Sequence, residues 1–139
     1  MDKQYVEQLR RQAAQHVQNY RATDGVDDPN VLILTTTGRR SGEPRSVPLI
    51  FSRDGDRLVL VASLGGAPHH PIWYLNLRDD PEVFIQVQRE RFAARARTAS
   101  GDERARLWRM MVSILPDYED FQARTTREIP LVVVERNDS

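Results

Sequence analysis

The sequence predicts a small, mainly β domain, an antiparallel barrel of about six strands with an N-terminal helix and short flanking helices. Apolar runs of strand length recur between residues 31 and 134. Glycine, proline and aspartate, which favour turns, separate most of these runs. The chain contains no Gly-x-Gly-x-x-Gly turn and no Walker-type lysine loop, so the doubly wound nucleotide folds lack their usual signatures.

An amphipathic helix is expected over residues 3–22. Its apolar positions follow steps of four and three, at Tyr5, Leu9, Ala13, Val17 and Tyr20. Residues 23–30 are rich in aspartate and contain glycine and proline, so they end the helix. We therefore divide the chain into a helix with its linker, residues 1–27, and a barrel domain, residues 28–139. The helix is expected to dock on the domain, and the alternatives are that it covers a cleft or lies on a membrane surface.

Six strand-like segments make up the expected barrel. They span residues 31–37, 46–53, 57–63, 83–88, 92–98 and 129–134. Pro71 opens a short helix that runs to Leu77. A longer helix follows Ser100, because Ser100-Gly101-Asp102-Glu103 fits a capping box with Ser100 as N-cap and Glu103 as its partner.

Composition excludes several classes of protein. The 139 residues carry 20 basic and 20 acidic side chains, so nothing draws the whole chain to nucleic acid. The absence of cysteine rules out disulfides, thiolate metal sites and cysteine nucleophiles. His16, His69 and His70 have no carboxylates at metal-ligand spacing, and no metal is expected. No apolar run approaches the roughly 18 residues of a membrane span, so we expect a soluble, cytoplasmic protein.

The strongest functional signal is the basic turn, residues 35–45. It joins two apolar strand-like runs and places Arg39, Arg40 and Arg45 within seven residues, with Pro44 stiffening its exit. Guanidinium groups and free backbone N–H groups on a short, stiff loop bind phosphate and carboxylate well. The turn therefore indicates an anion site, and the alternative is a solvated hairpin that is basic by chance.

Two further segments carry residues suited to a ligand site. In Ala62-Ser63-Leu64-Gly65-Gly66, Ser63 offers a hydroxyl and the two glycines let a planar ligand approach the backbone. Tyr118 and Phe121 lie one helical turn apart and share a face that would wall a pocket. On the residue pattern alone, a turn serine and ordinary aromatic packing explain these segments better.

The order of these segments resembles that of the deazaflavin (coenzyme F420)-dependent nitroreductase family. Over residues 28–136 the motifs are Thr-Thr-Gly-Arg-Arg-Ser-Gly-x-Pro-Arg, Ala-Ser-x-Gly-Gly, Pro-x-Trp-Tyr-x-Asn-Leu, Asp-Pro-x-Val, Pro-x-Tyr-x-x-Phe-Gln and Arg-Glu-Ile-Pro. The resemblance implies a split β-barrel similar to the pyridoxamine-phosphate oxidase-like proteins. It also implies reduced F420 as hydride donor to an electron-poor acceptor, such as a quinone or a nitro or enone compound.

The resemblance assigns the phosphodiester and polyglutamate tail of F420 to the basic turn, and its ring to three other segments. The implied cofactor-binding residues are Arg39, Arg40, Ser41, Arg45, Ser46, Val47, Pro48, Leu49, Ile50, Val61, Ala62, Ser63, Leu64, Ile72, Trp73, Tyr74, Leu75, Asn76 and Tyr118. Ser63 and Tyr118 are expected to be catalytic, because each offers a hydroxyl to the acceptor oxygen that gains charge.

Two other functions stay open on the sequence. An FMN-dependent oxidoreductase would use the same barrel, although FMN has a single phosphate and less need of an extended basic turn. A non-catalytic protein that carries F420 or an apolar ligand is the second. The expected partners are a small electron acceptor, a membrane surface touched weakly by residues 3–22, and a second copy of the chain, since split barrels of the wider superfamily are often dimers.

Overall fold

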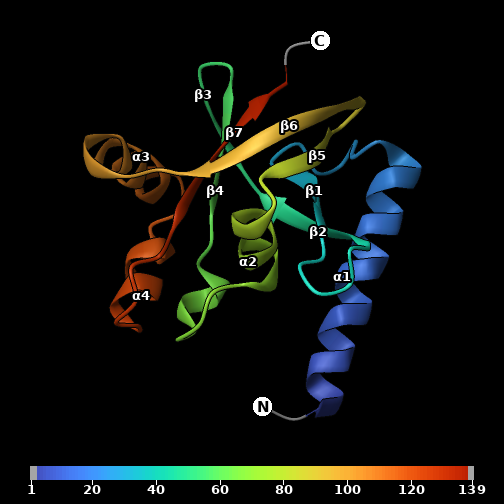
Figure 1. Cartoon of the computed structure of the whole chain (residues 1–139), viewed down its shortest axis with the longest axis horizontal. Helices are drawn as coiled ribbons and strands as arrows, with labels where there is room; N and C mark the ends of the chain where they lie inside the picture. Colours follow the sequence, from blue (N-terminus) through green and yellow to red (C-terminus); the bar gives the residue numbers. More distant parts are fainter. Residues whose placement is uncertain (1–2, 138–139) are drawn as a thin grey trace.

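The computed structural model describes residues 3–137, which form one curled antiparallel sheet with helices around it (Figure 1). In chain order the elements are α1 (Lys3–Thr23), β1 (Val31–Thr37), β2 (Pro44–Ile50), β3 (Ser52–Asp54), β4 (Arg57–Val61), the 3-10 turn η1 (Leu64–Gly66), α2 (Ile72–Asp79), β5 (Glu82–Val87), β6 (Glu90–Thr98), α3 (Gly101–Ile114), α4 (Asp117–Ala123) and β7 (Leu131–Arg136).

The seven strands form a single sheet in the order β2-β1-β5-β6-β7-β4-β3, with antiparallel pairing throughout. This arrangement confirms the predicted split β-barrel with an N-terminal helix and short flanking helices. It has one strand more than the segments predicted, because residues 46–53 divide into β2 and β3 at Phe51. The Phe51 side chain lies in the barrel core, and its N–H donates to the carbonyl of Asn30 (3.1 Å).

Two apolar clusters on opposite faces of the sheet fix the positions of α2 and α4. Leu60 of β4 packs in the barrel core with Trp73 of α2. The neighbouring Val59 packs in a second cluster with Leu107 of α3 and Tyr118 of α4. Because successive side chains of a strand point to opposite faces, β4 is covered on both sides. The loop that leaves β4 therefore emerges between α2 and α4.

The second half of α1 docks on the sheet, as expected. Val17 and Tyr20 pack against Ile33 of β1. The Tyr20 hydroxyl donates to the carbonyl of Val31 (2.8 Å) and accepts the N–H of Gln88 (2.7 Å), which ties the helix to β1 and to the β5–β6 turn. The first half of α1 extends beyond the sheet (Figure 1). In the part of the chain that the structure describes, no helix is long and apolar enough to cross a membrane.

The predicted capping box is wrong in its contacts, although α3 begins where it places the helix. Ser100 is the N-cap residue, but its side chain makes no capping hydrogen bond. Glu103 instead accepts hydrogen bonds from Arg97 (2.6 and 3.0 Å) and from Arg57 (3.3 Å). Asp54 joins the same surface network through Arg57 and Arg106. Cross-strand arginines thus outcompete the local backbone for the Glu103 carboxylate.

This network predicts a loss of stability in acid. Hydrogen bonds from Arg106 lower the pKa of Asp54, and those from Arg97 lower the pKa of Glu103. A carboxylate with a lowered folded-state pKa stabilises the fold above its ordinary pKa, and this contribution is lost as pH falls below about 4. The loss should be on the order of 1 kcal/mol, since these pairs stay partly in water. Urea unfolding of Glu103→Gln should show a flatter acid dependence than the wild type, and an unchanged slope would contradict this.

Candidate active site

The basic turn between β1 and β2 presents its arginines to solvent. Arg39, Arg40 and Arg45 are all exposed. Within residues 3–137 none of the three forms a salt bridge, and the Arg45 guanidinium group bonds only the Ser41 hydroxyl (3.3 Å). The turn itself is closed by the N–H of Gly38 on the carbonyl of Glu43 (2.8 Å). Unpaired guanidinium groups on a closed turn are free to bind an anion.

Asn76 of α2 braces this turn from inside. Its side chain is 2% exposed. Its Oδ1 accepts the backbone N–H of Arg39 (3.1 Å), and its Nδ2 donates to the hydroxyl of Thr36 (3.1 Å). The predicted site residue Asn76 therefore fixes the basic turn against α2, a role that the sequence pattern did not indicate.

We expect Asn76→Ala to weaken anion binding without touching an arginine. The substitution leaves the N–H of Arg39 without its acceptor, which costs on the order of 1–3 kcal/mol of stability and frees the turn. Thr36→Val is the matched control, because it removes the second hydrogen bond of Asn76 and keeps the first. Titration with F420 should show a clearly weaker Kd for Asn76→Ala than for Thr36→Val. Equal F420 affinities of the two variants would show that the hydrogen bond from Arg39 to Asn76 does not support anion binding.

The predicted cofactor-binding run Ser46 to Ile50 is divided between the two faces of β2. Val47 and Leu49 pack against the barrel core. Ser46 points to the other face, where its hydroxyl bonds Arg21 of α1 (3.0 Å) and Thr35 of β1 (2.7 Å). Pro48 and Ile50 follow Ser46 in alternation. One ligand on one face can meet only half of these side chains.

The loop after β4 carries donors with no protein partner. Ser63 is in the right-handed helical region, while Leu64 and Gly65 have positive φ (45° and 62°). Such an αR–αL sequence turns successive N–H groups towards one point and binds anions or carbonyl oxygens. Among the described residues, the N–H groups of Ser63, Leu64 and Gly65 and the Ser63 hydroxyl donate no hydrogen bond. A leucine at positive φ is strained, and such strain is concentrated at functional sites.

Gly66 serves α4 and not a ligand, which corrects one expectation. A Cβ at Gly66 would lie 2.5 Å from the carbonyl oxygen of Phe121. The close backbone approach predicted for both glycines is therefore used at Gly66 to seat α4, whereas nothing lies within 4 Å of a Cβ at Gly65. This contact sets α4, and with it Tyr118, against the loop that carries Ser63.

Gly66→Ala should disturb α4, and Gly65→Ala is its control. Both glycines have positive φ, so each alanine is strained by roughly 1–2 kcal/mol. Only Gly66→Ala adds the clash with Phe121, which should cost on the order of 1–3 kcal/mol more. Gly66→Ala should therefore have a lower melting temperature than Gly65→Ala, and a lower rate of quinone reduction. Similar losses in the two would mean that α4 is not seated through Gly66.

Tyr118 is buried with a free hydroxyl. Its side chain is 5% exposed and its ring meets that of Phe121 edge-on, 6.1 Å between centroids, so the predicted shared face is confirmed. Burial raises the pKa of the Tyr118 hydroxyl, which therefore keeps its proton at neutral pH. Within the described chain this hydroxyl makes no hydrogen bond. It can donate to a ligand.

The remaining predicted residues lie around the same end of the barrel. Trp73 and Tyr74 are buried in the barrel core, and the Tyr74 hydroxyl bonds that of Thr98 (2.8 Å). Ile72 is 63% exposed at the start of α2. The others are Val61, Ala62 and Leu64 next to Ser63, and Leu75 between Tyr74 and Asn76. Figure 1 shows the β1–β2 turn, α2 and α4 in the lower half of the view.

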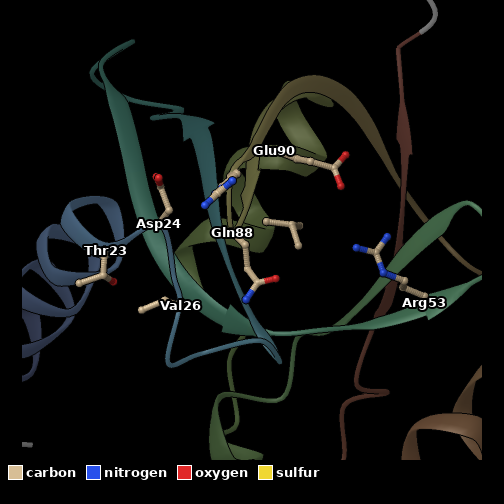
Figure 2. Close-up of a pocket in the computed structure, with 8 residues that line it drawn as sticks. Thr23, Asp24, Val26, Arg53, Gln88 and Glu90 are labelled. Carbon is tan, nitrogen blue, oxygen red and sulfur yellow. The ribbon is translucent and has the colours of Figure 1, made fainter.

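A shallow depression of about 350 Å³ lies elsewhere, at the end of α1 and the β5–β6 turn. Figure 2 shows Asp24, Arg53 and Gln88 around it. None of its lining residues belongs to the predicted site. This depression is therefore separate from the basic turn and from the Ser63 loop.

The fold is that of a split-barrel protein, and the exposed donors are of the kind that suits an anionic ligand. The chain matches the F420H(2)-dependent quinone reductase family over residues 6–136. It is 39% identical over 126 residues to the F420H(2)-dependent quinone reductase Rv1261c of Mycobacterium tuberculosis, which covers 84% of this chain and 85% of the relative. The chain therefore belongs to the F420H(2)-dependent quinone reductase family, and the predicted F420-dependent oxidoreductase is confirmed at this level.

Solved structures of other proteins share this fold, and one of them is named as an F420-dependent reductase. An F420-H2 dependent reductase (FDR-A) superposes with a TM-score of 0.70 at 37% identity, over 76% of this chain and 94% of its own. A domain-swapped dimer superposes with a TM-score of 0.74 at 35% identity, over 94% and 98%. A pyridoxamine 5'-phosphate oxidase-like protein from Listeria innocua, at 12% identity and a TM-score of 0.55, shares the fold.

Proposed function

We propose that this chain reduces a quinone with a hydride from reduced F420, bound along the basic turn and the loop after β4. The observation that carries this is the set of guanidinium groups of Arg39, Arg40 and Arg45, which have no carboxylate partner in the described chain, together with the free backbone donors of the loop after β4. F420 bears a phosphodiester and a polyglutamate tail, and this donor set fits a ligand with several negative charges. FMN, with one terminal phosphate, would use only part of it.

When bound, reduced F420 supplies the hydride, and the chain's own residues supply position and polarity. The arginines hold the tail, and Asn76 fixes the turn that carries them against α2. The Ser63 hydroxyl donates a hydrogen bond to the quinone oxygen as that oxygen gains negative charge. Tyr118, protonated and buried, offers a second donor from α4. The apolar residues of α2 and α4 keep water from the reacting atoms.

The first test is a fluorescence titration of the purified protein with F420, with FMN in parallel. We expect micromolar or tighter binding of F420 and much weaker binding of FMN, followed by oxidation of reduced F420 when a quinone is added. Preferential FMN binding would move the chain to flavin chemistry. F420 binding without turnover on a panel of quinones, nitro compounds and enones would make it a carrier.

We also propose that the first half of α1 docks on a second copy of the chain. The stripe that buries Val17 and Tyr20 continues to Leu9 and Tyr5, which are 43% and 50% exposed. On the same face of the sheet as Ile33, Phe84 of β5 is 46% exposed. A related structure is a domain-swapped dimer, which supports a second copy as the occupant of this stripe.

Light scattering and vesicle co-sedimentation together test this proposal. The wild type should be a dimer, and Tyr5→Ser with Leu9→Ser should give a monomer. Ala14→Ser, on the opposite side of α1 by the helical period, should leave the dimer intact. A monomeric wild type that sediments with anionic vesicles, and loses this in the double variant, would assign the stripe to a membrane surface and overturn the dimer.

A further inference from the structure

Arg127, in the segment between α4 and β7, reaches back to the loop that follows β4. Its Nε donates to the carbonyl of Ala67 (2.8 Å), its Nη1 to that of Ala62 (3.2 Å) and its Nη2 to that of Ser63 (2.7 Å). Nη1 also lies 3.1 Å from Nδ1 of His70. One planar group thus binds four points of a loop that is about sixty residues away in sequence.

The charge of Arg127 has no acidic partner within residues 3–137. The side chain is half-buried, and its charge is met by carbonyl dipoles and one imidazole. A buried cation without a counter-ion is costly unless all its N–H groups are satisfied. The contacts hold the carbonyls of Ala62, Ser63 and Ala67 towards the guanidinium group. The N–H groups of residues 63–65 are left without protein acceptors.

We propose that Arg127 is a positioning residue of the F420 site: it holds these carbonyls on one side of the loop, so that the N–H groups of residues 63–65 are presented to F420 and the Ser63 hydroxyl to the acceptor. The proposal rests on the proposed function. It assigns Arg127 no contact with the cofactor. Arg127 affects F420 binding only by fixing the conformation of the loop.

The tautomer and the protonation state of His70 depend on its contact with Arg127. A guanidinium group only donates, so His70 accepts through Nδ1 and carries its proton on Nε2. Burial, with the charges of Arg127 and Arg78, lowers the pKa of His70, whose ring also lies 4.9 Å from that of Tyr74. His69 adjoins it in the chain. A protonated His70 would face Arg127 with a second positive charge, so the contact is lost as pH falls through a value below about 6.5.

Three variants test the role of Arg127. Arg127→Met removes the guanidinium group and Arg127→Lys keeps the charge without the planar fork. Arg124→Met is the matched control, because Arg124 is exposed, stacks over Phe121 and makes one long contact to the same loop, 3.4 Å to the carbonyl of Gly65. Each is measured for thermal stability, F420 affinity from pH 5 to 8, and the nitrogen chemical shifts of His70.

Arg127→Met should weaken F420 binding by roughly tenfold or more, since N–H groups of the loop that turn away from the ligand no longer donate hydrogen bonds to it. Arg127→Lys should stay several-fold weaker than wild type, and Arg124→Met should bind normally. The weakening of F420 binding in acid should be lost in Arg127→Met, because protonation of His70 then has no contact with Arg127 to break. A purely structural role would lower the melting temperature and leave the acid dependence of binding as in the wild type.

Wild-type affinity in Arg127→Lys would overturn the proposal, since charge alone would then suffice. Unchanged His70 shifts in Arg127→Met would overturn it as well. A wild type that binds no F420 would instead remove the proposed function. The His70 shifts would still show whether Arg127 shapes the loop.

Discussion

Replacing Arg39 and Arg45 together with alanine should weaken F420 binding by two orders of magnitude or more. A charge-assisted hydrogen bond contributes about 1.5–3 kcal/mol, which is roughly ten- to a hundredfold in Kd for each arginine lost. Neither guanidinium group pairs with a carboxylate in the described chain. The double substitution should therefore cost the fold little stability. The measurement is a fluorescence titration with F420 of short and long glutamate tails.

The tail length makes this result specific. The loss should grow with the number of glutamates, and the salt dependence of Kd should become shallower in the double variant. The double variant Arg89→Ala with Arg109→Ala, at two exposed arginines outside the basic turn, controls for the change of two in net charge. A double variant that binds both tail lengths like the wild type would remove the basic turn from the site.

Ser63→Ala should lower the rate of quinone reduction by about a hundredfold while leaving F420 affinity nearly unchanged. A hydroxyl that donates to the developing charge on the acceptor contributes roughly 3 kcal/mol to the transition state and little to the ground state. The Ser63 hydroxyl has no hydrogen-bond partner in the described structure. Its removal therefore leaves no other protein group without a partner. Single-turnover kinetics with reduced F420 and a soluble quinone give the rate.

Two variants sharpen the test of Ser63. Tyr118→Phe keeps the buried ring and removes only the second donor, and we expect a smaller loss, roughly tenfold. Ser113→Ala changes a serine on α3, whose hydroxyl bonds the carbonyl of Met110, and should be neutral. A Ser63→Ala enzyme with normal turnover and weaker F420 binding would make Ser63 a binding residue only.

Local patterns predicted the elements well because their causes are local. The alternation of apolar residues places β1 at residues 31–37, as found, and the step of three and four places α1 within one residue of its end. The division at Phe51 was not predictable, since it depends on a hydrogen bond to Asn30 and on burial in a core that other strands complete. The capping box fails for a similar reason, because Glu103 is bound by Arg97 and Arg57, which lie on strands that only the folded chain brings to it.

Residue type and short-range spacing are enough to predict the chemical groups of the site: a basic turn, a serine at the end of a strand, and an aromatic pair on one helical face. The contacts between these groups appear only in the folded chain, where Asn76 accepts the N–H of Arg39, Gly66 packs against Phe121, and Arg127 binds the carbonyls of the Ser63 loop. Each joins residues 37 to 64 positions apart in the chain. Such pairs form only when the curled sheet brings its end loops together, which no local pattern records.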